Sequence, residues 1–136
     1  MNDPIRILLV DDSPYFLEAA REFLQIQEPR ALIEVASEEQ DALAKSMVSA
    51  PDIILLDLNL TDISGLALIP LFRKHLPEVK IIILTIMSDD SYRAAALQAG
   101  ADAFVQKNEM SKKLISTITG LMECRHDAPA DKESNP

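Results

Sequence analysis

The sequence predicts an α/β fold built on a parallel sheet, and two patterns support this prediction. Short apolar segments recur along the 136 residues, and a helical pattern follows each of them. Strands that alternate with helices form parallel sheets joined by right-handed crossovers. The apolar segments are also almost continuous, as expected of strands buried on both faces of a sheet. The expected strands are 5–10, 32–36, 53–56, 80–84 and 103–106.

The first two helices have clear boundary signals. Ser13 can cap the first helix with its hydroxyl, and Pro14 suits the first helical position, where no backbone N–H is needed. Ser37 followed by Gln40 has the spacing of a capping box at the start of the second helix. We expect this helix to end before Pro51, because the residue that precedes a proline disfavours helical geometry.

The boundaries of the other three helices rest on single residues. Pro70 falls within the helical pattern of residues 66–75, so it must lie in the first turn or kink the helix. The fourth helix is expected over residues 89–99 and is closed by Gly100, a residue type common just past helix ends. Ser111 is expected to cap the fifth helix.

Length and composition predict one domain. The chain is large enough to bury a single hydrophobic core and too small for two independent ones. We assign residues 1–124 to this domain. Residues 125–136 are poor in apolar side chains, so we expect a mobile tail or a truncated linker there.

Charge and hydropathy exclude several classes of protein. The net charge of -9 gives no basic surface for nucleic acid, so we expect no direct contact with DNA or RNA. The apolar runs are too short to span a membrane, and the first ten residues do not have the pattern of a secretory signal. We therefore expect a cytoplasmic protein that does not bind membranes.

Three aspartates follow predicted strands directly. Asp11 and Asp12 come after the first strand, and Asp57 comes after the third. Open α/β sheets bind their ligands at the carboxyl ends of the strands, where these side chains would lie. Three carboxylates brought together would repel one another, and a divalent cation is the simplest partner that neutralises them. The sequence therefore predicts a site for a hard metal ion.

Thr85 and Lys107 occupy the ends of two further strands at the same edge of the sheet. A carboxylate can accept a phosphoryl group to form an aspartyl-phosphate, a transfer catalysed mainly by positive charge around the phosphoryl oxygens. The metal ion and Lys107 would supply that charge, and Thr85 would add a hydroxyl donor. By contrast, Asp89, Asp90 and Asp102 are interpreted as solvated residues, with Asp89 or Asp90 capping the fourth helix.

Together these residues resemble the receiver domain of bacterial two-component response regulators. The resemblance covers residues 6–121. Asn108 stands after Lys107 where many members carry a proline, which resembles the NarL/LuxR-type transcriptional regulators, whose receivers are joined to helix-turn-helix domains. The matched residues are Asp11 and Asp12, then Asp57 with Asn59 and Gly65, then Thr85, and the segment Ala-Gly-Ala-Asp-Ala-Phe-Val-Gln-Lys that begins at Ala99.

The resemblance implies both a fold and a site. The fold would be a flavodoxin-like (βα)5 three-layer sandwich with strand order 2-1-3-4-5. Asp57 would accept the phosphoryl group, and Lys107 and Thr85 would stabilise it. Thr85 and Phe104 would be the switch residues. Mg²⁺ would be held by Asp11, Asp12, Asp57 and the backbone carbonyl of Asn59.

The implied function is that of a signalling switch and not of a multiple-turnover enzyme. A histidine kinase or a histidine phosphotransfer protein would donate the phosphoryl group, and the modified chain would change its interactions. A homodimer through the fourth and fifth helices is a further expectation. The sequence leaves open whether the chain is a stand-alone regulator or the receiver of a longer DNA-binding protein.

Two other functions are compatible with the same residues. A degenerate receiver would act as a docking module without phosphorylation, although every residue of the acceptor site is present. A metal-dependent phosphohydrolase of the haloacid dehalogenase type would also form an aspartyl-phosphate. Such enzymes usually carry an aspartate two residues after the nucleophile, where this chain has Asn59.

Overall fold

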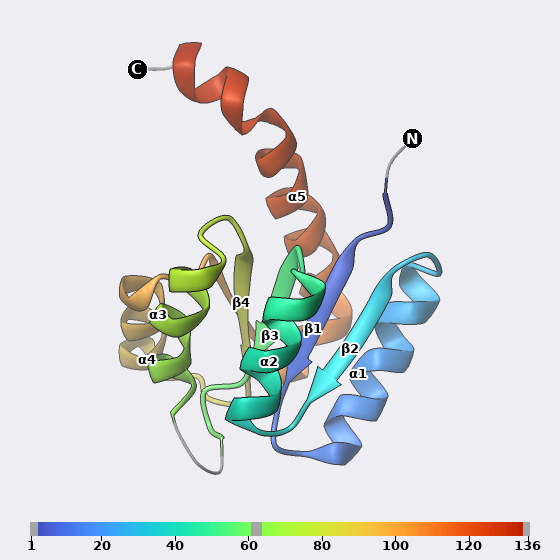
Figure 1. Cartoon of the computed structure of the whole chain (residues 1–136). Coiled ribbons are helices and arrows are strands. Elements are labelled where there is room, and N and C mark those ends of the chain that lie inside the picture. The colour runs from blue at the N-terminus through green and yellow to red at the C-terminus, as the bar shows by residue number, and fades with distance from the viewer. Residues whose placement is uncertain (1–2, 61–63, 135–136) are drawn as a thin grey trace.

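A parallel sheet forms the centre of the molecule (Figure 1). The computed structural model describes residues 3–60 and 64–134. The strands lie side by side in the order β2-β1-β3-β4-β5, and every neighbouring pair is parallel. The expected flavodoxin-like fold and its strand order are therefore confirmed. The strands are β1 Arg6–Val10, β2 Leu32–Ala36, β3 Ile53–Leu56, β4 Lys80–Thr85 and β5 Ala103–Gln106.

The helices cover both faces of this sheet and complete a three-layer sandwich (Figure 1). Helices α1 (Pro14–Gln27) and α5 (Met110–Ser134) pack on one face. Helices α2 (Glu39–Ser49), α3 (Gly65–His75) and α4 (Asp90–Ala99) pack on the other. A short 3-10 helix, η1 (Lys107–Glu109), joins β5 to α5. None of the helices in the described part of the chain is long and apolar enough to cross a bilayer.

The central strands are apolar at their buried inner positions because helices cover both of their faces. Along β1, Leu8 and Val10 belong to the core under α2, α3 and α4, whereas Ile7 and Leu9 belong to the core under α1 and α5. Successive side chains of a strand point to opposite faces, so each residue must be apolar. Burial of one such side chain contributes about 1.5–3 kcal/mol.

The predicted start of α1 is confirmed, and that of α2 is wrong. The Ser13 hydroxyl accepts a hydrogen bond from the backbone N–H of Phe16 at 3.2 Å. The first residue of α2 is Glu39, and Glu38 occupies its N-cap without a side-chain capping bond. Ser37 therefore lies one residue too early to cap the helix. The same helix ends at Ser49, before Pro51, as expected.

Of the later helix boundaries, one was predicted correctly and one was predicted wrongly. Gly100 closes α4 with a φ of 122°, as predicted. Pro70 lies inside α3 and not in its first turn, because the helix already begins at Gly65, so the other alternative, a kink at Pro70, stays a prediction. Ser111 is not a cap, because the 3-10 turn of η1 leads directly into α5 at Met110. Helix α5 continues to Ser134, past the end of the apolar pattern, and the proposed boundary between residues 124 and 125 stays a prediction.

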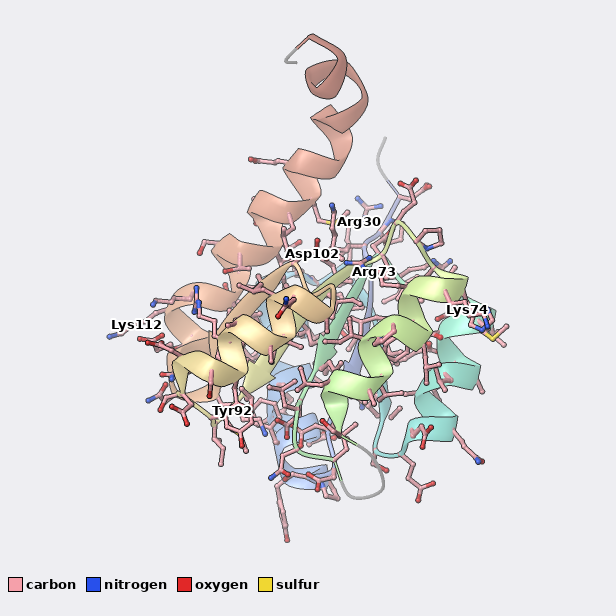
Figure 2. The ribbon with its side chains drawn as sticks, turned by 90° about the vertical axis from the view of Figure 1, so that its left-hand side faces the viewer. Arg30, Arg73, Lys74, Tyr92, Asp102 and Lys112 are labelled. Carbon is pink, nitrogen blue, oxygen red and sulfur yellow. The ribbon has the colours of Figure 1, made fainter. Side chains whose placement is uncertain are left out.

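An ion pair fastens the sheet at the amino ends of β4 and β5, and Figure 2 shows its two partners, Arg73 and Asp102. The two side chains approach to 2.6 Å, and Arg73 also donates to the carbonyl of Gly100 at 2.8 Å. The Asp102 carboxylate accepts a second bond from the N–H of Ile81 at 2.8 Å. The interpretation of Asp102 as a solvated residue is therefore wrong, since it joins α3 to two strands.

Candidate functional site

The strand register brings the predicted acidic residues together. Strands β1 and β3 are neighbours, and the N–H of Asp57 donates to the carbonyl of Val10 at 3.0 Å, so Asp57 lies beside the end of β1. Asp11, Asp12 and Asp57 each offer a carboxylate oxygen, and these oxygens all lie within 4.8 Å of one another. The parallel sheet thus produces the predicted cluster, because both strands end at the same edge.

Two of the three carboxylates are buried. Asp11 is 2% exposed and Asp57 is 5% exposed, whereas Asp12 faces solvent. Burial raises the pKa of the Asp11 carboxyl above its ordinary value, and the charge of Asp57 raises it further. A bond from Lys107 and one from the N–H of Ser13, at 2.9 Å, oppose this rise in the pKa. Both donors therefore favour the ionised form of Asp11.

Lys107 supplies positive charge to both buried carboxylates. Its Nζ lies 2.6 Å from Oδ2 of Asp11 and 3.6 Å from Oδ2 of Asp57. The lysine begins η1 directly after β5, and its side chain is 14% exposed. The low exposure strengthens both ion pairs, because little water separates the charges. The predicted position of Lys107 at the acidic cluster is thus observed.

The donor set of the cluster suits a hard divalent cation. Oδ1 of Asp57 is buried and has no hydrogen-bond partner in the described part of the chain. A buried acceptor without a donor is costly, and a metal ion would satisfy it. Carboxylate oxygens are the ligands that Mg²⁺ prefers. Asn59, in the loop after β3, forms an isolated backbone bridge with Ser64, and its carbonyl stays a predicted ligand.

The predicted switch residues lie in β4, which is next to β3, and in β5, which is next to β4. Thr85 is the last residue of β4 and is fully buried. Its hydroxyl accepts a hydrogen bond from the N–H of Met87 at 3.3 Å, so its own proton is free for another acceptor. Phe104 in β5 is half-buried beneath α4, with the guanidinium of Arg93 at 5.6 Å from the centre of its ring.

Gly65 lies in close contact with the backbone of Asp57 and Leu58. A Cβ atom at this position would lie 2.3 Å from the carbonyl oxygen of Asp57 and 2.7 Å from Cα of Leu58. These contacts are impossible for any other residue type without movement of the backbone. The N–H of Gly65 donates to the carbonyl of Leu58 at 2.8 Å, so the first turn of α3 rests directly on the acidic strand end.

The aromatic neighbour of Lys107 was not identified from the sequence. The Nζ of Lys107 lies 4.0 Å from the centre of the Phe16 ring, which comes from the first turn of α1. The only available signal was an aromatic residue four positions after Asp12. Phe16 also fits the apolar face of the first helix, so the local sequence does not distinguish a core residue from a neighbour of Lys107.

Comparison with known proteins gives matches over most of the chain. The family model of the response regulator receiver domain matches residues 7–119. Response regulator protein VraR of Staphylococcus aureus is 28% identical over 114 residues, which are 84% of this chain and 54% of that protein. The chain thus spans about half the length of the curated relatives that it matches.

Solved structures give the same result. A two-component response regulator of the LuxR family from Aurantimonas sp. is similar with a TM-score of 0.82 at 26% identity, over 88% of this chain and 86% of that one. The BeF3-activated DrrB receiver domain is similar with a TM-score of 0.79 at 28% identity, over 88% of this chain and 98% of that one.

Replacing Gly65 tests the close contact at the acidic strand end. We expect Gly65→Ala to lower the free energy of unfolding by about 1–3 kcal/mol, because the added methyl group meets backbone atoms. Gly120→Ala is the matched control: its Cβ would meet nothing within 4 Å, so the unfolding free energy should rise by up to about 1 kcal/mol. Urea denaturation measures both changes. Equal effects of the two substitutions would contradict the account of Gly65.

Replacing Asp11 tests the cost of burying its charge. In the folded state the pKa of Asp11 is above its ordinary 3.8, so its protonated form favours folding. That contribution is complete below pH 3.8 and is lost as the pH rises through the folded-state pKa. We expect Asp11→Asn, in EDTA, to be more stable than the native chain at pH 7, with a difference that shrinks toward pH 4. Urea denaturation across this range measures it, and a difference that grows on acidification would contradict the sign.

Proposed function

Because this chain belongs to the response regulator receiver domain family, we propose that it is the phospho-accepting switch of a two-component signalling system, with Asp57 as the acceptor. One observation carries the assignment of Asp57. Its carboxylate is buried beside Asp11, faces the ammonium of Lys107 at 3.6 Å, and holds Oδ1 without a hydrogen-bond partner in the described residues. Such a carboxylate is held in place and is available to react.

The proposed reaction is transfer of a phosphoryl group from a phosphohistidine. An oxygen of Asp57 forms a bond to phosphorus while the phosphorus–nitrogen bond of the donor breaks, and the released imidazole takes up a proton. The ammonium of Lys107 faces the phosphoryl oxygens and balances their charge. Mg²⁺, held by Asp11, Asp12, Asp57 and the backbone carbonyl of Asn59, would supply further positive charge to the same oxygens.

Conversion of the Asp57 carboxylate to an acyl phosphate changes the charge and the hydrogen-bond acceptors next to β4. The phosphoryl group adds negative charge and new acceptor oxygens beside the end of β4, where the Thr85 hydroxyl has a proton to donate. In the proposed switch Thr85 moves toward the phosphoryl group and the ring of Phe104 turns inward. That turn would break the contact with Arg93, whose guanidinium lies 5.6 Å from the ring, at a cost of only about 0.5–1 kcal/mol.

The proposed partners follow from the same role. The donor is a histidine kinase or a histidine phosphotransfer protein, and the chain itself is not a multiple-turnover enzyme. A homodimer through α4 and α5 is the proposed output, and Figure 2 shows Tyr92 of α4 and Lys112 of α5 on that side of the molecule, both exposed. A cytoplasmic location and the absence of direct nucleic-acid contact stay predictions. A stand-alone regulator and the receiver of a longer DNA-binding protein both stay alternatives.

Intact-mass spectrometry tests the proposed function. After incubation with acetyl phosphate and Mg²⁺, the native chain should gain the mass of one phosphoryl group, and neither Asp57→Asn nor a sample with EDTA should gain it. Asp41→Asn is the matched control, because Asp41 lies in α2 and pairs with Lys45 away from the acidic cluster, so this variant should be modified normally. An unmodified native chain would overturn the proposal and favour a docking module, whereas an equally modified Asp57→Asn would overturn Asp57 as the acceptor.

A further inference from the structure

Lys107 is held between a carboxylate and an aromatic ring. Its Nζ lies 2.6 Å from Oδ2 of Asp11 and 4.0 Å from the centre of the Phe16 ring. A cation over the face of a ring is attracted by the negative charge density there, and the attraction grows as water is removed. With its side chain 14% exposed, Lys107 is largely shielded from water, so the contact with Phe16 is in the stronger range.

The ring and the carboxylate come from one short segment. Asp11 directly follows β1, and its Oδ1 accepts from the N–H of Ser13 at 2.9 Å. The hydroxyl of Ser13 in turn accepts from the N–H of Phe16 at 3.2 Å. These two bonds join the Asp11 carboxylate to the first turn of α1, which carries the ring, so the two groups that contact the ammonium of Lys107 are linked to each other.

A lysine without such a contact is poorly positioned. Its four-carbon stem has many rotamers, and its compact ammonium is strongly hydrated and can turn toward solvent. The ring of Phe16 and the carboxylate of Asp11 both contact the ammonium, and each contact limits the positions that it can take. Both contacts therefore favour the position in which Nζ lies 3.6 Å from Oδ2 of Asp57.

We propose that Phe16 is a positioning residue for phosphoryl transfer, which acts by holding the ammonium of Lys107 beside Asp57. This inference rests on the proposed function of Asp57. Phe16 also packs against the core under α1 and α5, so a purely structural role is the competing explanation. The two roles differ in whether the effect of Phe16 requires Lys107.

Two substitutions separate the ring from its apolar volume. Phe16→Leu removes the ring and keeps an apolar side chain, whereas Phe16→Tyr keeps the ring. We expect Phe16→Leu to lower the initial rate of phosphorylation by acetyl phosphate and Mg²⁺ about five- to tenfold, and Phe16→Tyr to stay within about twofold of the native rate. Equal rates for the leucine variant and the native chain would overturn the inference.

A double-mutant cycle tests whether the effect passes through Lys107. In a Lys107→Ala chain the ring has no ammonium to hold, so adding Phe16→Leu should change the rate less than about twofold. If Phe16→Leu slows the Lys107→Ala chain as strongly as it slows the native chain, Phe16 acts through packing alone and the inference is wrong. Urea denaturation shows that each variant is folded before its rate is compared.

Proton–carbon NMR of the Lys107 side chain gives a readout that needs no phosphorylation. The Hε protons should be shifted upfield by the ring in the native chain and in Phe16→Tyr, and this shift should disappear in Phe16→Leu. No shift in the native chain would overturn the placement of the ammonium on the ring. A native chain that shows the shift but takes no phosphoryl group would instead overturn the proposed function and leave the contact established.

Discussion

Two carboxylates buried side by side at the end of a parallel sheet are the constraint on which the rest of the site depends. Asp11 and Asp57 lie there because β1 and β3 are neighbours, and the four residues that precede each aspartate are apolar and buried. The fold cannot separate the two charges without changing the register of its core. Nearby groups must therefore neutralise the two negative charges or donate hydrogen bonds to them, and the residues around the two carboxylates do so.

Lys107 is the main positive charge near the two carboxylates, and it follows β5, the strand at one side of the sheet. Strand β5 and the turn of η1 bring its Nζ to within 2.6 Å of one carboxylate and 3.6 Å of the other. A single ammonium does not balance the cluster, which explains why the site suits a divalent cation. In the proposed function, phosphorylation of Asp57 changes the charge of this cluster. Thr85 in β4 and Phe104 in β5 are the residues proposed to move in response.

At the amino ends of β4 and β5, an ion pair and its hydrogen bonds stabilise the sheet. There Arg73 bonds to Asp102 and to the carbonyl of Gly100, which joins α3 to β4 and to the start of β5. The amino ends of these strands are thus fixed by an ion pair, whereas their carboxyl ends carry Thr85 and Lys107. Thr85, one of the two proposed switch residues, is the last residue of β4 and lies at the end of that strand away from this anchor.

The sequence predicts the strands and the acidic cluster well because their signals are local. Strands buried on both faces must be continuously apolar, and the polar residues that follow them mark one edge of a parallel sheet. Features set by distant partners were not predictable. Asp102 pairs with Arg73, 29 residues away, and no local sequence pattern predicts this pairing. No local pattern predicts the contact of Phe16 with Lys107 either.

The predicted starts of two helices were wrong for a different reason. Ser37 and Gln40 are the residue types of a capping box at the right spacing, but α2 begins one residue later than a capping box at these positions requires. At Ser111, a 3-10 turn that has no sequence signature of its own carries the chain into α5 before the serine is reached. Such shifts depend on how the preceding strand leaves the sheet, which the local residues do not specify.

We propose that Asp57, Lys107 and a divalent cation together bind a phosphoryl group. Fluorine NMR with beryllofluoride, which mimics that group on a carboxylate, tests this most directly. In the presence of Mg²⁺ the native chain should give resonances of bound fluoride that are absent from Asp57→Asn and are removed by EDTA. A native chain without bound resonances, or an Asp57→Asn chain that shows the same ones, would contradict the account.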